Sequence, residues 1–133
     1  MLTSNQVAGN ALPIICNQEN FILKANAYTL INALPNHYLI IKPAEKPSLE
    51  GGRPKNGMFI AFPLLYKSSV EDVSPSHWRI QAAILKCSSY KILIINSYFP
   101  TDPQTRKYDD TELIETLHCI RNLLVNVDHD AVL

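Results

Sequence analysis

Short apolar runs alternate along this chain with polar stretches and with segments of helical spacing. The run LPIIC (12–16) is continuous and apolar, which is typical of a strand covered on both faces. Similar runs predict strands at 37–43 and 58–66. Because proline cannot donate a ladder hydrogen bond, we expect Pro63 to break the last of these strands or to place it at a sheet edge.

Two longer apolar segments predict a hairpin in the second half of the chain. Residues 77–87 and 91–99 both have strand character, and only the letters SSY separate them. Such a short connection favours antiparallel neighbours. The last residues, 128–133, should open one more strand.

Helical periodicity occurs in two segments. Residues 24–34 carry apolar side chains at helical spacing, and Pro35 should end that helix. A longer helix is expected at 110–126, with Glu112 and Glu115 in its first turns, where the helix dipole favours acidic side chains. Its apolar stripe is expected to consist of Leu113, Leu117, Ile120 and Leu124.

This mixture of elements predicts the α/β class. We expect an α+β sandwich with a mixed, mainly antiparallel sheet and flanking helices. Residues 1–11 are small and polar and should form a loose N-terminal remnant, whereas 12–133 should form the domain. The segment 44–57 is rich in proline, glycine and charge, and as a loop it is long enough to be functional or mobile.

Composition and charge narrow the function only slightly. The 133 residues fit one domain, and the 47% hydrophobic content permits a packed core. Twelve basic and twelve acidic residues cancel, so the chain has no global basic field of the kind that many nucleic-acid binders use. A catalytic nuclease is still possible, because it needs only local contacts.

The three cysteines and the absence of apolar spans indicate an intracellular setting. Cys16, Cys87 and Cys119 are odd in number and form no CxxC pair, so we expect reduced thiols packed in the core. No stretch reaches the roughly 20 apolar residues of a membrane span, and no targeting signal is visible. We therefore expect a nuclear or cytoplasmic protein with no membrane partner.

A polar cluster directly after the first apolar run is the main candidate for chemistry. The letters NQEN (17–20) could simply begin a loop, or they could carry the Glu19 carboxylate to the mouth of a site. Phosphodiester cleavage needs charge neutralisation and an activated water, which Mg²⁺ supplies when one or two carboxylates hold it. A tyrosine hydroxyl can donate a hydrogen bond to a phosphate oxygen.

Several segments, in order, resemble the endonuclease/exonuclease/phosphatase superfamily. They are most similar to the apurinic-type endonuclease domain of non-long-terminal-repeat retrotransposons. The resemblance rests on IICNQENFILKAN (14–26), GRPKNGMFIA (52–61), WRIQAAILK (78–86), ILIINSYFPTDP (92–103) and DDTELIETLHCIRNLL (109–124). Together they cover nearly all of the chain from about residue 12, and their order with the NSYFPTDP segment makes the match specific.

The resemblance implies roles for particular residues. Glu19, in the pair Gln18-Glu19, matches a carboxylate that binds the divalent metal. Tyr98, in the sequence Tyr98-Phe99-Pro100, matches a phenol that approaches the scissile phosphate. Asn96 lies two residues before it and is the second catalytic candidate.

Substrate contacts are expected from three further residues. Gln18, Arg53 and Thr101 are the candidates, although a solvated loop charge is the simpler interpretation of Arg53 and of its neighbour Lys55. The pair Trp78-Arg79 could face a phosphate, but a tryptophan at a strand start favours the core.

The resemblance also implies a fold, a cofactor and partners. We expect an incomplete form of the four-layer fold of the superfamily, Mg²⁺ or Mn²⁺ that is weakly bound or absent in this chain, and DNA as the substrate. The matching family continues into a Gly-Asp-x-Asn motif and a late Asp-His pair, whereas this sequence ends at DAVL. The remainder of the domain and a reverse transcriptase are therefore expected partners, and this chain is expected to be catalytically incomplete.

Two other functions stay open. The chain could be a non-catalytic transposon remnant or binding module, in which Glu19 is an ordinary carboxylate at a strand end. It could also be a phosphoesterase that acts on small or lipid phosphates.

Overall fold

The computed structural model describes residues 12–47, 52–99 and 111–133, so the expected loose segment 1–11 lies outside it. The strands are β1 (Ile15–Gln18), β2 (His37–Lys42), β3 (Met58–Pro63), β4 (Val70–Asp72), β5 (Ile80–Cys87), β6 (Tyr90–Ser97) and β7 (Ala131–Val132). The α-helices are α2 (Tyr28–Ala33) and α3 (Thr111–Asn126), and the 3₁₀ helices are η1 (Lys24–Asn26) and η2 (Leu64–Ser69).

The first sheet has three antiparallel strands in the order β1-β3-β2. All six residues of β3 are buried, because β3 is the central strand. The expectation that Pro63 breaks this strand or places it at an edge is therefore only partly met. Pro63 ends β3 opposite His37, where the ladder stops and a missing N–H costs little.

The second sheet has four strands in the order β4-β5-β6-β7. The predicted hairpin is confirmed, since β5 and β6 pair antiparallel along their whole length. The turn between them places Ser88 in the left-handed region, with φ of 56°. The strand expected at 128–133 is β7, which pairs parallel with β6.

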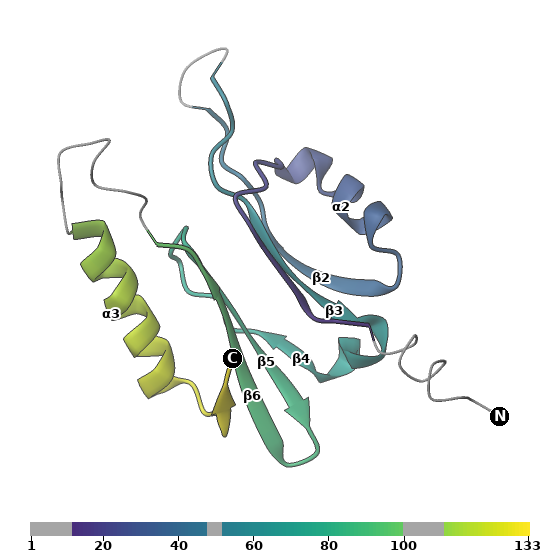
Figure 1. Ribbon diagram of the computed structural model, residues 1–133, viewed down its shortest axis with the longest axis vertical. Coiled ribbons are helices and arrows are strands. Elements are labelled where there is room, and N and C mark those ends of the chain that lie inside the picture. The colour runs from purple at the N-terminus through teal and green to yellow at the C-terminus, as the bar shows by residue number, and fades with distance from the viewer. Residues whose placement is uncertain (1–11, 48–51, 100–110) are drawn as a thin grey trace.

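The two sheets lie face to face between the two α-helices (Figure 1). One apolar core lies between the sheets and includes Ile60, Phe62 and Leu85. A second core, with Ile80, Leu93 and other residues, lies between the four-stranded sheet and α3. The predicted α+β sandwich with mainly antiparallel sheets and flanking helices is thus confirmed.

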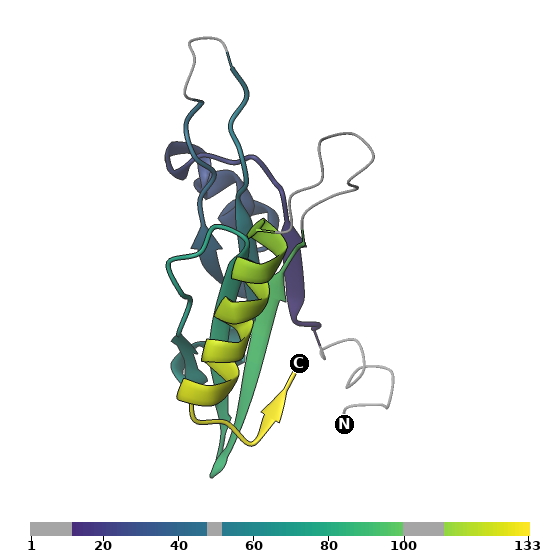
Figure 2. The same cartoon turned by 90° about the vertical axis from the view of Figure 1, so that its left-hand side faces the viewer.

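Helix α3 agrees with the predicted range but only in part with the predicted stripe, of which Ile120 packs against the second core. It lies along the four-stranded sheet (Figure 2), and its buried residues are Thr116 and Leu123. Leu117 and Leu124 of the expected stripe are 49% and 40% exposed. Thr116 tolerates full burial because its Oγ1 donates to the Glu112 carbonyl at 2.7 Å.

Several smaller expectations also need correction. The helix expected at 24–34 divides into η1 and α2, and neither has a buried residue. β1 is not covered on both faces, because its burial alternates between intermediate and exposed along the strand. For the same reason Cys16 is exposed, and Cys87 is exposed at the end of β5, whereas Cys119 is partly buried. Within the described part of the chain, no helix is long and apolar enough to cross a membrane.

Candidate functional site

A cavity of about 540 Å³ lies where segments of the two sheets meet. Three stretches form it: the residues after β1, the residues before β3 and the turn before β5. Its lining includes Glu19, Phe21, Arg53, Asn56, Trp78 and Arg79.

One wall is shaped by an unusual backbone. Glu19, Phe21 and Asn56 have φ of 54°, 60° and 67°, a region that side chains other than glycine and asparagine rarely adopt. Main-chain hydrogen bonds hold this wall, from Asn20 N to Gly57 O at 3.0 Å and from Phe21 N to Asn56 O at 2.9 Å. Gly57 has φ of 90°, and a Cβ there would lie 2.3 Å from Asn20 Oδ1. Backbone strain of the kind that the positive φ angles of these residues indicate is often found at functional sites.

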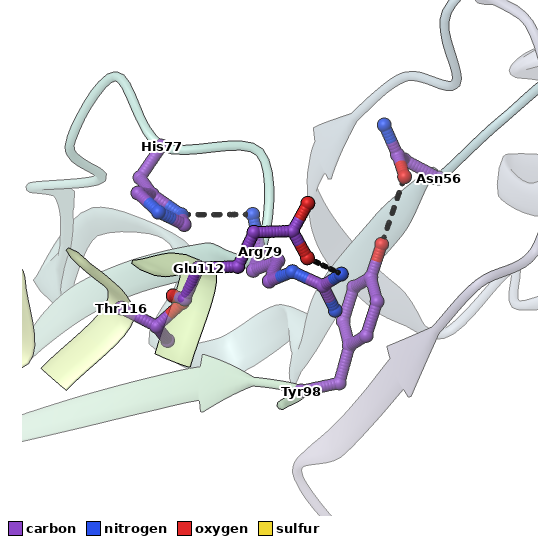
Figure 3. Close-up of polar contacts among 6 residues, drawn as sticks. All are labelled: Asn56, His77, Arg79, Tyr98, Glu112 and Thr116. Atoms are coloured by element: carbon purple, nitrogen blue, oxygen red, sulfur yellow. Dashed lines mark hydrogen bonds and ion pairs between the residues drawn. The ribbon is translucent and has the colours of Figure 1, made fainter. Parts of the chain in front are cut away.

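The opposite wall contains a buried arginine. Arg79 is 7% exposed, and its Nη2 donates to Glu112 Oε2 at 3.0 Å (Figure 3). Its Cζ lies 3.9 Å from the Trp78 ring centroid and 5.1 Å from that of Tyr98. Arg79 Nε is buried and has no hydrogen-bond partner among the described residues. A buried donor without a partner is costly, so this atom can gain from a ligand.

The turn that carries Arg79 is fixed by a histidine and a lysine. Arg79 N donates to His77 Nδ1 at 3.2 Å (Figure 3). Lys42 Nζ donates to the carbonyls of Pro75, His77 and Ile80 at 3.0, 2.5 and 2.7 Å. Burial of the ring lowers the pKa of His77, and the Lys42 ammonium lowers it further. A neutral imidazole can accept the Arg79 N–H.

Tyr98 lies beside the cavity with a protonated hydroxyl. Its Oη donates to Asn56 Oδ1 at 3.0 Å, and its ring meets that of Trp78 edge to face at 5.9 Å. Burial raises the pKa of Tyr98, the Arg79 guanidinium opposes this shift, and the Glu19 carboxylate adds to it. The charge of Glu19 therefore acts on the phenol, although the two residues come from the ends of strands in different sheets.

Two of the predicted site residues instead connect the sheets. Gln18 Nε2 donates to Asn96 Oδ1 at 3.0 Å and to Ser97 O at 2.7 Å. Asn96 is 2% exposed, and its Nδ2 donates to Asn17 O at 3.0 Å and Phe59 O at 3.1 Å. Hydrogen bonds of this kind favour a structural role for both amides.

The remaining predicted residues divide as follows. Glu19 and Arg53 line the cavity, whereas Thr101 lies outside the described residues. Trp78 was expected to lie in the core. It is instead 36% exposed and lines the cavity. In the sequence, the signal for this cavity was a large aromatic residue next to an arginine at the start of a strand.

Asn56 and Phe21 are site residues that were not predicted from the sequence. The dipeptide Asn56-Gly57 indicates a left-handed turn, which is a local signal for the wall of the cavity. Phe21 has no comparable signal, because its exposure depends on the strained backbone after β1.

Among the described residues that line the cavity, Glu19 is the one carboxylate that could bind a magnesium ion. The described residues contain no group of three or more His, Cys, Asp or Glu side chains that could hold a metal. Mg²⁺ typically keeps several waters and uses one or two carboxylates together with substrate phosphates. Glu19 fits that limited requirement if a phosphate is bound next to it.

No family model, curated protein or solved structure matches this chain. The side chains around the cavity are therefore what can indicate a function.

Proposed function

We propose that this chain is a DNA-cleaving domain of the endonuclease/exonuclease/phosphatase type that hydrolyses a phosphodiester with Mg²⁺ or Mn²⁺. One observation carries the proposal. The carboxylate after β1 and the phenol after β6 come from different sheets. The Tyr98 hydroxyl donates at 3.0 Å to Asn56, which lines the same cavity as Glu19, Arg53 and Arg79. A carboxylate can hold the metal, and a phenol and a guanidinium can stabilise charge on the phosphate.

Each group has a separate task in the proposed site. Arg53 and Lys55 are exposed on the cavity wall and attract the DNA backbone. The protonated Tyr98 hydroxyl can turn from Asn56 to donate to a nonbridging phosphate oxygen. Glu19 would hold the metal, which supplies charge neutralisation and an activated water.

Supercoiled plasmid tests the proposal. We expect Mg²⁺-dependent nicking that falls at least about tenfold in Glu19→Gln, through loss of metal binding, and about 100-fold in Tyr98→Phe, through loss of a phosphate donor. The matched control is Glu71→Gln, which changes an exposed carboxylate on β4 and should nick like the wild type. Nicking by the wild type that does not exceed that of Glu19→Gln would overturn the proposal.

A non-catalytic DNA-binding module is the second candidate. It is favoured by Asn96, whose amide is buried and bonded to main-chain carbonyls of the other sheet. Binding of labelled DNA in EDTA, without nicking in Mg²⁺, would support this function over the first.

A further inference from the structure

We infer that the cavity binds an unpaired nucleobase of single-stranded DNA, with Phe21 and Trp78 as the stacking side chains. This inference rests on the proposed function only in taking DNA as the ligand. It does not require cleavage, so the two can fail separately.

Two large aromatic side chains are exposed in the same cavity. Phe21 is 40% exposed and Trp78 is 36% exposed, and both line it. They come from different segments, one after β1 and one before β5. Aromatic side chains that are left accessible in a concave site are suited to stack with a planar ligand.

Each aromatic ring is accompanied by an arginine. Arg53 Cζ lies 4.9 Å from the Phe21 ring centroid, and Arg79 Cζ lies 3.9 Å from that of Trp78. A cation over a ring restrains the ring and adds positive charge beside it. The cavity therefore combines stacking surface with cations for a phosphate backbone, which is the combination that single-stranded nucleic acid requires.

The size and polarity of the cavity fit one nucleotide. Its volume of about 540 Å³ is in the usual range for small-ligand sites. Arg79 lines the cavity, and its guanidinium supplies positive charge that favours a phosphate oxygen. The neighbouring ion pair with Glu112 holds the guanidinium in place.

Duplex DNA should be a poorer ligand than single-stranded DNA. A base that is stacked and paired in a duplex cannot enter a cavity unless it is flipped out, which costs unstacking energy. A single strand offers its bases without that cost.

Trp78 makes this inference directly measurable, because it is the only tryptophan in the sequence. The full chain is titrated in EDTA with a short oligothymidylate, with an abasic oligonucleotide of the same length, and with duplex DNA. We expect the oligothymidylate to quench Trp78 fluorescence and to bind about tenfold more tightly than the abasic strand. Equal quenching and affinity for these two strands would show that the site binds only phosphate and would overturn the inference.

Variants at Phe21 separate stacking from charge. Phe21→Leu should lose about tenfold in affinity for oligothymidylate but not for the abasic strand, and Phe21→Tyr should retain wild-type binding. The control is Tyr90→Leu, which removes an exposed aromatic at the start of β6. Unchanged binding by a folded Phe21→Leu would contradict the inference. If that variant does not fold, the comparison of strands on the wild type still decides.

Discussion

At the scale of single residues, the position of Arg79 depends on the imidazole of His77. The ring accepts the Arg79 N–H at Nδ1, and it can do so only without a proton on that nitrogen. Burial and the nearby Lys42 ammonium lower the pKa of His77, so folding favours the neutral ring. The cavity wall is thereby coupled to pH.

The direction in which folding stability changes with pH gives the first prediction. Because the folded pKa of His77 lies below the unfolded value of about 6.5, its stabilising contribution is present above that pH and is lost as the pH falls toward the folded pKa. His77→Asn keeps an acceptor that does not titrate. Thermal melts between about pH 8 and about pH 5 should show the wild type losing stability relative to His77→Asn on the acid side. Parallel curves for the two proteins would contradict the prediction.

At the scale of elements, the face that α3 buries can be tested with two adjacent leucines. Leu123 is 6% exposed in the core against the four-stranded sheet, whereas Leu124 is 40% exposed. Leu123→Ala should lower the free energy of unfolding by about 2–5 kcal/mol, and Leu124→Ala should change it by no more than about 0.5 kcal/mol. Urea denaturation measures both. A larger loss for Leu124→Ala would mean that the helix packs by its other face, and equal losses would contradict the predicted difference between the two leucines.

The same helix illustrates what the sequence could predict about the fold. Its length followed from periodicity, and the hairpin followed from two apolar runs with a short connection. The buried face was predicted only in part, through Ile120, because α3 carries apolar side chains on more than one side and the sheet that it covers decides between them. Pro63 is a similar case, since the position of β3 between β1 and β2 depends on pairing between distant segments.

The candidate site was predictable only where one segment carried a signal. Glu19 and Tyr98 were found because strand-end motifs contain them, and the structure places both at or beside the cavity. Asn96 and Gln18 lie in the same motifs, yet their amides bond across the sheets. Arg79 was not assigned to the site, because the neighbouring Trp78 was expected in the core. The burial of Arg79 beside Glu112 is created by two elements distant in sequence and left no local signal.

At the scale of the whole molecule, polar side chains connect the two sheets near the cavity. Asn96 reaches the main chain of β1 and β3, and Gln81 Nε2 donates to Ile40 O of β2 at 2.6 Å. Lys42, at the end of β2, holds the turn before β5. Because the cavity takes one wall from each sheet, its shape depends on how the sheets dock.

Lys42 makes the contact that most directly connects the docking of the two sheets with the cavity. Lys42→Met keeps much of the apolar stem but removes the ammonium donor from three carbonyls, of which His77 O still accepts from Ile80 N, so we expect a loss of about 1–3 kcal/mol in the free energy of unfolding. The turn should then loosen, and the fluorescence of Trp78 should shift to longer wavelength before global unfolding. Lys86→Met is the matched control, because Lys86 is half-exposed on β5 and pairs with Glu71 only at 3.7 Å. It should change stability by no more than about 0.5 kcal/mol. If Lys42→Met unfolds at the same urea concentration as Lys86→Met, with unchanged fluorescence, then the docking of the sheets does not depend on this ammonium.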